Sequence, residues 1–330
     1  MPDSTPAAEP ETPDLGPLNR ALARAEEARK KAQDFDGPAY FSGEWEAAET
    51  QYSGAGALSR TNKADVQQAL VLYNSAADAY EGIFRESVPL YAQDRENEIL
   101  STRNEVIATG LTGQFPEYLY KADMVSTAAL AQYKAEDYYA AKDSAASALS
   151  MYTALKTGAG AYLTRQEIVN RNFVHYDSEN FSRADQAGLA AVNSYDTGEN
   201  ERAISEAEEA ALRYKLALDA GWASYAADRG AIAGAERQKA LDLKANVAVK
   251  EDFNNALKIY NQAETALRAK NHEQAAALYI QSESEFAAAG RMAVEKRRIA
   301  EEAIRLAEEK MIESEENARN AELILEGGAQ

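Results

Sequence analysis

The chain repeats itself at a fixed spacing, and this constrains its fold more than any other feature of the sequence. Residues 122–152 align with residues 184–214 at a constant offset of 62 and without a gap. A further shift of 72 brings residues 256–286 onto the same pattern, and a looser copy with an insertion in its turn covers roughly residues 41–83. Such recurrence is typical of arrays in which each repeat is one supersecondary unit that packs on its neighbours.

Each copy predicts two helices joined by a short polar turn, such as "YKAED" at 133–137, "YDTGEN" at 195–200 and "AKNHE" at 269–273. Alanine, the strongest helix former, recurs at matched positions, where its small side chain lets paired helices approach closely. A Tyr or Phe at matched positions closes the end of each pair. The residues that we expect to pack within repeats are Tyr80, Tyr133, Tyr152, Tyr195, Tyr214, Phe286, Ala141, Ala203 and Ala275.

The prediction for the whole chain is an all-α fold, an elongated array of antiparallel helical hairpins joined by long helices. The connecting segments have helical composition, so the second helix of each hairpin is expected to continue well past its repeat. Two glycine-containing stretches, "GAGAL" at 54–58 and "GAGAY" at 158–162, are expected to break helices. The helical repeat domain is placed at residues 18–290, with hairpins at about 41–83, 120–155, 182–217 and 253–289.

The two ends of the chain differ from the repeats. Residues 1–17 are rich in proline and small polar residues, which predicts a disordered tether. Residues 291–330 predict a long charged helix, packed on the array or extending it. Its small and apolar residues alternate at spacings of four and three, as in a heptad seam, and we expect this seam to pack closely on a neighbouring helix rather than to self-associate. The seam consists of Ala300, Ile304, Ala307, Met311, Ser314, Ala318, Ala321 and Leu325.

Composition excludes several classes of function. A net charge of −19 without a basic stripe argues against binding nucleic acid or an anionic membrane surface. The absence of cysteine excludes thiolate chemistry, and no apolar run is long enough to form a transmembrane segment. Of the two histidines, His175 has Asp177 and Glu179 nearby, which could ligate a metal, but we favour a polar loop there, and His272 lies in a repeat turn. No catalytic group, cofactor site or metal site is predicted, so we expect a protein that is not an enzyme.

Aromatic residues outside the repeat register are the candidate partner-binding residues. Trp222 and Tyr225 lie three apart on one predicted helical face and are preferred. Trp45, Tyr138 and Tyr139 are further candidates, because aromatic side chains are common anchors at protein interfaces. Packing between helices is the alternative for all five residues.

The second helix of each hairpin resembles that of tetratricopeptide repeats. In "NHEQAAALYIQS" a turn precedes Ala275, Tyr279 and Ser282, in a small, large, small order. "DYYAAKDSAASAL" and "ENERAISEAEEAAL" fit the same pattern. The first-helix positions of that family, a Trp and a Leu-Gly pair, are missing here, as is its helix-ending proline. The resemblance implies helical hairpins that bind a protein partner.

Residues 20–52 resemble the alanine-rich hairpins of bacterial cell-envelope lipoproteins, in which alanines precede a Tyr-containing turn and then a W..A...Y pattern. The resemblance implies a periplasmic protein with a protein partner in the envelope, an N-terminal lipid anchor in the native precursor and cell-wall contact through a separate domain. The expected function is therefore a structural or interaction scaffold. The alternative is a ligand-binding module that encloses a small hydrophobic or aromatic molecule.

Overall fold

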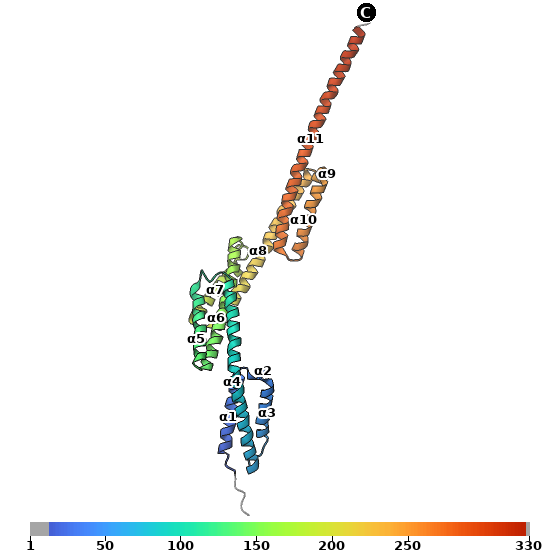
Figure 1. Ribbon diagram of the computed structural model, residues 1–330. Coiled ribbons are helices and arrows are strands. Elements are labelled where there is room, and N and C mark those ends of the chain that lie inside the picture. The colour runs from blue at the N-terminus through green and yellow to red at the C-terminus, as the bar shows by residue number, and fades with distance from the viewer. Residues whose placement is uncertain (1–12, 328–330) are drawn as a thin grey trace, which may run out of the picture. The chain divides into compact units, whose positions relative to one another are not determined.

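The computed structural model describes residues 13–327, and every regular element in that range is a helix (Figure 1). The predicted all-α class is therefore confirmed. The chain divides into two compact units. Unit 1 holds the residues up to Ala159 together with Ala191–Ser205, and unit 2 holds Gly160–Ala190 and the residues from Glu206 onward. No helix in the described range combines the length and the apolarity that a bilayer crossing requires.

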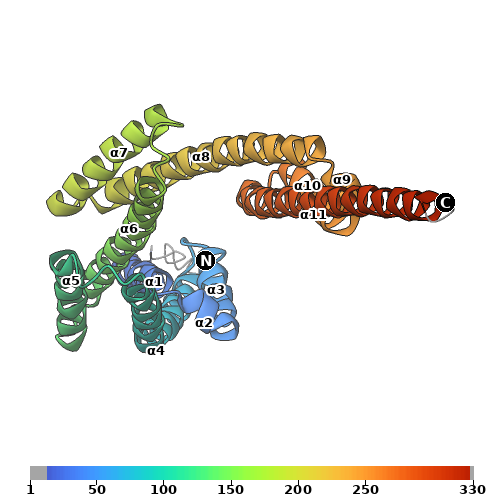
Figure 2. The ribbon, with the colours of Figure 1, turned by 90° about the horizontal axis from the view of Figure 1, so that it is seen from above.

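Unit 1 is built around one long helix, α4, against which α1 and α3 both pack (Figures 1 and 2). Asn62 caps α4, because its side-chain oxygen accepts a hydrogen bond from the amide of Ala64 at 2.9 Å. The elements that lie wholly or mostly in unit 1 are α1 (Gly16–Asp34), α2 (Gly37–Tyr40), α3 (Ser42–Gly56), α4 (Lys63–Ala108), α5 (Pro116–Lys134) and α6 (Tyr138–Asn170).

Unit 2 has a comparable set of helices, in which α10 packs along the first part of α11 (Figure 1). The helices α6, α7 and α8 each contribute residues to both units. The remaining elements are α7 (Ser178–Thr197), α8 (Asn200–Asp242), α9 (Ala245–Ala248), α10 (Lys250–Arg268) and α11 (His272–Gly327).

The turns recur as regularly as the helices. A residue with positive φ lies seven positions after each of four arginines, at the end of the helix that carries the arginine. A second set of positive-φ residues ends three of the helices in the hairpins. A residue in this left-handed conformation ends a helix and changes the direction of the chain. Because such residues recur at matched positions, the corresponding helices end in similar turns. The first set is Asp36, Gly110, Asn172 and Lys244, and the second is Glu136, Gly198 and Lys270.

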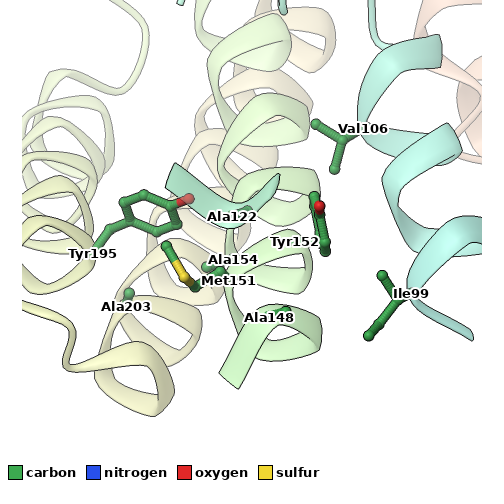
Figure 3. Packing of buried hydrophobic residues seen from close by; sticks show 9 residues of the cluster. All are labelled: Ile99, Val106, Ala122, Ala148, Met151, Tyr152, Ala154, Tyr195 and Ala203. Atoms are coloured by element: carbon green, nitrogen blue, oxygen red, sulfur yellow. The ribbon is translucent and has the colours of Figure 1, made fainter. Parts of the chain in front are cut away.

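The cores combine alanine with a few large rings. In one unit 1 cluster, Tyr152 of α6 lies on the side of its helix that faces Ile99 and Val106 of α4, while Ala122 of α5 and Ala148 of α6 allow close approach (Figure 3). All residues expected to pack within repeats are buried except Tyr133, which is half-buried. The buried ones are Tyr80, Tyr152, Tyr195, Tyr214, Phe286, Ala141, Ala203 and Ala275.

The long helices α4, α6, α8 and α11 continue past the repeated segments of the sequence, as the composition of the connectors predicts. The expected break at 158–162 is wrong, because Gly158 and Gly160 lie inside α6. Glycine costs about 1 kcal/mol relative to alanine in a helix. Packed residues on both sides, Ala154 and Ala161, offset that cost and keep the helix continuous. The other expected break is confirmed, since α3 ends at Gly56.

The two ends also differ from expectation. The helix α1 begins at Gly16, inside the predicted tether, and residues 1–12 of that tether lie outside the described residues. In α11 the side chains from Val294 to Leu323 are all exposed, so the expected close packing of the seam on a neighbouring helix is not found within the described chain. Buried contacts of α11 stop at Ala293, because the facing core around Phe253 extends no further. Leu325 lies outside the described side chains.

Candidate functional site

Three side chains from three helices meet in a polar cluster in the first part of unit 1. Arg29 of α1 holds Glu49 of α3 with both nitrogens of its fork, Nε to Oε1 at 2.5 Å and Nη2 to Oε2 at 3.1 Å. Tyr80 of α4 donates its hydroxyl hydrogen to Glu49 Oε1 at 2.7 Å. The guanidinium of Arg29 also lies 5.6 Å from the ring centre of Trp45, a predicted partner-binding residue. Trp45 in turn packs on Tyr80, with ring centres 5.0 Å apart.

The same cluster recurs in the second part of unit 1. Arg103 of α4 donates from Nε and Nη2 to the two oxygens of Asp123 of α5, at 2.7 and 2.9 Å. Tyr152 of α6 donates to Asp123 Oδ1 at 2.5 Å. The arginine precedes the carboxylate by 20 residues, as in the first cluster, and the tyrosine follows by 29 residues instead of 31.

A third copy lies in unit 2. Arg165 of α6 donates from Nε to Asp185 Oδ1 of α7 at 2.8 Å, and Tyr214 of α8 donates to the same oxygen. The spacings of 20 and 29 residues are those of the second cluster. Two of the long helices therefore serve two clusters each: α4 provides Tyr80 to one and Arg103 to the next, and α6 provides Tyr152 and Arg165.

The clusters hold their carboxylates ionised. Hydrogen bonds from Arg103 keep the pKa of Asp123 below its usual range against the opposing effect of burial, and Tyr152 adds to the lowering. Burial and the hydrogen bond to Asp123 both raise the pKa of Tyr152, so its hydroxyl stays protonated and donates. Each carboxylate already accepts two or more hydrogen bonds. The arrangement therefore fastens three helices together and leaves the carboxylate few lone pairs for a ligand.

A fourth position keeps only one of the three residues. Arg237 of α8 lies 72 residues after Arg165, but Leu257 and Phe286 stand where the carboxylate and the tyrosine would be. Phe286 is fully buried, and Nε of Arg237 is buried without a hydrogen-bond partner among the described residues. The guanidinium lies 5.7 Å from the ring centre of Tyr260 instead.

A cavity of about 440 Å³ lies in unit 1, beside the middle of α4. Four aromatic rings line it, those of Phe35, Tyr91, Tyr133 and Tyr138. Arg95, Glu96 and Lys142 are the charged residues in its wall. Further lining comes from Val88, Pro89, Ala92, Gln93, Ile99, Leu100, Ser126, Thr127, Ala129, Leu130, Ala141 and Ala145.

Lys142 is the central cation of this wall. Its Nζ donates to the carbonyl oxygen of Asp34 and lies 5.2 Å from the ring centre of Phe35 and 5.1 Å from that of Tyr91. Arg95 lies 5.4 Å from the ring centre of Tyr91, and its Nη1 pairs with Glu98 one turn along the same helix at 2.7 Å. Nε of Arg95 is buried and has no hydrogen-bond partner within residues 13–327.

The predicted partner-binding residues do not gather at one place. Tyr138 lines the cavity, and the neighbouring Tyr139, 42% exposed, donates to Asp34 Oδ2 at 2.9 Å. In unit 2, Trp222 and Tyr225 lie together and pack on Phe173, with ring centres 5.3 and 5.7 Å from it.

The histidines show no metal site. The ring of His175 packs on Tyr176 at 4.0 Å, and Nδ1 of His272 is buried without a hydrogen-bond partner. Within the described residues, no three side chains of His, Asp or Glu gather as metal ligands would.

Reasoning from sequence missed the polar clusters, although a signal was present. Arg103 and Arg165, like Asp123 and Asp185, are 62 residues apart, the offset of the repeat itself. A single acidic residue on a helix does not indicate such a pairing, because most acidic side chains on helices face solvent. The cavity left no signal of comparable strength, because its wall includes residues from four separate segments.

Comparison with known proteins identifies no relative: no protein-family model, no curated protein and no solved structure matches this chain.

Proposed function

We propose that this chain is a non-enzymatic scaffold that binds a protein partner along the exposed part of α11. The observation that carries the proposal is the stretch from Val294 to Leu323, in which every side chain is exposed. Seven large apolar residues within it are each at least 46% exposed: Val294, Ile299, Ile304, Leu306, Met311, Ile312 and Leu323. Soluble proteins rarely leave an extended row of apolar side chains uncovered unless it contacts a partner.

The charges beside this row favour a basic partner. Glu301, Glu308, Glu315 and Glu322 recur every seven residues, each next to a residue of the seam. Ion pairs between residues of α11 stabilise its exposed part, which has no neighbouring helix among the described residues. Examples are Arg297–Glu301 at 2.7 Å and Arg305–Glu309 at 2.6 Å. An amphipathic helix with an apolar face flanked by Lys or Arg would complement this surface.

The finer arrangement belongs to the same proposal. Antiparallel hairpins at about 41–83, 120–155, 182–217 and 253–289, similar to tetratricopeptide hairpins, would form an elongated array that carries the binding helix. The recurring arginine–carboxylate–tyrosine clusters support this arrangement, because each joins a hairpin to the helix that precedes it. Small-angle X-ray scattering should give a maximum dimension well above that of a globular protein of 330 residues.

The cell envelope is the proposed location, with an N-terminal lipid anchor in the native precursor and cell-wall contact through a separate domain. Its support is the resemblance of residues 20–52 to alanine-rich envelope lipoproteins. Fractionation of the host bacterium, with an antibody against the purified chain, should place the protein in the periplasm or with the outer envelope. Recovery in the cytosol would contradict this part of the proposal.

The partner-binding test compares two double variants. Ile304→Asn with Met311→Asn changes the apolar seam, whereas Glu302→Gln with Glu309→Gln changes nearby exposed residues outside it. Affinity capture from an envelope extract should retain a protein on the wild type and on the glutamine variant and lose it on the seam variant. Equal capture by all three proteins would exclude this surface. Dimerisation of the purified chain that the seam variant abolishes would replace the partner with a second copy.

A second candidate function is the binding of a small molecule, and the observation that favours it is the cavity beside α4. Its volume lies within the range of about 300–1,000 Å³ that small-molecule sites occupy. The cavity belongs to unit 1, while the exposed seam of α11 belongs to unit 2, so the two functions can be tested separately.

A further inference from the structure

The segment of α4 that lines the cavity in unit 1 has a counterpart in unit 2 that makes several of the same contacts. Residues 87–95 of α4 correspond to residues 221–229 of α8 at a constant offset of 134, the sum of two repeat offsets. In unit 1 the hydroxyl of Tyr40 donates to Asp94 Oδ2 at 2.5 Å, and in unit 2 the hydroxyl of Tyr176 donates to Asp228 Oδ2 at 3.0 Å.

Two further contacts are shared. Tyr91 packs on Phe35 with ring centres 5.3 Å apart, and its counterpart Tyr225 packs on Phe173 at 5.7 Å. Arg95 and its counterpart Arg229 both bury Nε without a hydrogen-bond partner. The two places are therefore copies of one packing scheme, and their differences can be compared position by position.

The first difference is a large ring. Val88, in the cavity wall, corresponds to Trp222 in unit 2. The indole of Trp222 packs on Phe173, with ring centres 5.3 Å apart. The guanidinium of Arg171 lies over the indole, 4.3 Å from its ring centre. A valine at this position leaves room that an indole fills in the other copy, which accounts for the cavity in unit 1.

The second difference is a carboxylate. Arg229 pairs with Glu283 of α11, an ion pair between two helices. The position that corresponds to Glu283 in unit 1 is Leu149, so Arg95 lacks this partner and pairs only with Glu98 of its own helix. Unit 1 has an additional cation as well, because Lys142 corresponds to the buried Ala276. The wall of the cavity thus holds two cations and one carboxylate, Glu96, in a chain of net charge −19.

We propose that the cavity in unit 1 binds a small aromatic carboxylate, whose fused ring lies among Phe35, Tyr91, Tyr133 and Tyr138 and whose carboxylate contacts Arg95 and Lys142. The ring supplies the surface that Trp222 supplies in unit 2, and the carboxylate supplies the charge that Glu283 supplies there. This inference deepens the small-molecule candidate and is independent of the scaffold proposal.

Isothermal titration of the purified full-length chain with 2-naphthoate and indole-3-propionate tests the proposal. Both acids should bind with a stoichiometry of one. The matched neutral alcohol, 2-naphthalenemethanol, should bind at least about tenfold more weakly, because it cannot form a charge-assisted contact with the two cations. An absence of binding, or equal affinity for acid and alcohol, would overturn the proposal.

Two cavity variants and one control locate the site. Val88→Trp puts the residue of unit 2 into the wall and should abolish binding, whereas Val71→Trp, on the exposed side of α4, should leave the affinity unchanged. Lys142→Ala introduces the residue that unit 2 tolerates, and it should remove most of the preference for the acid over the alcohol. Unchanged binding by folded Val88→Trp, or an unchanged preference in Lys142→Ala, would place the ligand elsewhere. None of these titrations includes a protein partner, so their outcome is separate from that of the scaffold proposal.

Discussion

Unit 2 contains the third polar cluster, around Asp185, and the corresponding place around Leu257, where no such cluster forms. At both places three helices pack together, but through different contacts. Around Asp185, an arginine, a carboxylate and a tyrosine join three helices through hydrogen bonds. Around Leu257, the same three helix positions join through apolar contact, with Phe286 fully buried. The polar cluster is therefore not required for the helices to assemble.

At the apolar position Arg237 keeps its place without a carboxylate partner among the described residues, and because its side chain is only half-buried, the missing partner costs little. A buried ion pair is often worth no more than well-packed apolar residues, whereas an ion pair with one partner removed is strongly destabilising. What a polar cluster contributes is register, because the fork of an arginine and a tyrosine hydroxyl satisfy one carboxylate only in one alignment of the helices. The comparison predicts that stability depends on complete clusters.

The largest effect is expected when the third cluster is broken. Asp185→Leu leaves Arg165 and the hydroxyl of Tyr214 without their acceptor. Breaking a buried pair costs about 3–5 kcal/mol, and the part exposure of this pair lowers our expectation to about 2 kcal/mol. Urea unfolding followed by Trp222 fluorescence, in a Trp45→Phe background, measures the loss.

The control for this variant is Asp219→Leu, which removes the exposed pair with Lys215 on the same helix as Tyr214. Its loss should stay below about 0.5 kcal/mol. Equal losses in the two variants would mean that the cluster contributes no more than a surface pair.

Completing the fourth position should show the opposite effect. Phe286→Tyr alone buries a hydroxyl without an acceptor and should cost about 1–2 kcal/mol. With Leu257→Asp added, the carboxylate can accept from both Arg237 and the new hydroxyl, at the spacings of 20 and 29 residues found in the third cluster. The double-mutant cycle should give a favourable coupling of about 2 kcal/mol. Additive effects would show that matching sequence spacing is not sufficient to form the cluster.

Acid should reduce the difference between the two kinds of position. Burial alone would raise the pKa of Asp185, but the hydrogen bonds from Arg165 and Tyr214 outweigh it and hold the pKa below its usual range. A carboxyl whose pKa is lower in the folded state stabilises the fold above its unfolded pKa, near about 4, and this stabilisation is lost as the pH falls through the folded pKa.

The advantage of the wild type over Asp185→Leu should therefore shrink by about 1 kcal/mol between pH 5 and pH 2.5. Urea unfolding at each pH measures it. A constant difference across this range would contradict the assigned direction of the pKa shift.

The smallest effect is expected at the arginine without partners. Arg237→Met removes a cation that lies over the ring of Tyr260 and has no carboxylate partner among the described residues, and the free energy of unfolding should change by less than about 0.5 kcal/mol. The matched variant, Arg165→Met, leaves Asp185 without its cation and should cost about 2 kcal/mol. Comparable losses at both positions would mean that the guanidinium of Arg237 stabilises the fold through its contact with Tyr260, because methionine keeps most of the apolar stem.

The helices were largely predictable from sequence because their signals are local. Alanine at matched spacing indicated helices, the polar turns indicated where they end, and the composition of the connectors predicted the long helices. The break expected at Gly158 and Gly160 failed for the same local reason: glycine weakens a helix where it stands, but packing on both sides decides whether the helix continues.

The cavity could not be predicted, since it depends on which residues of different helices face each other. Nothing in the sequence around Val88 distinguishes it from other apolar residues that pack between helices. Its correspondence to Trp222 marks the place as hollow, and Leu149 at the position that corresponds to Glu283 leaves Arg95 without a carboxylate from that helix position.

By itself, the sequence determined that the chain is helical, where it repeats and which faces of its helices are apolar, because these properties follow from periodicity within a few turns of one helix. The tertiary structure alone decided that Arg165, Asp185 and Tyr214 meet, that Arg237 has no such partners, and that one copy of a shared packing scheme encloses a cavity. These outcomes depend on turn geometry and helix register, which set the distance between side chains 20 or more residues apart.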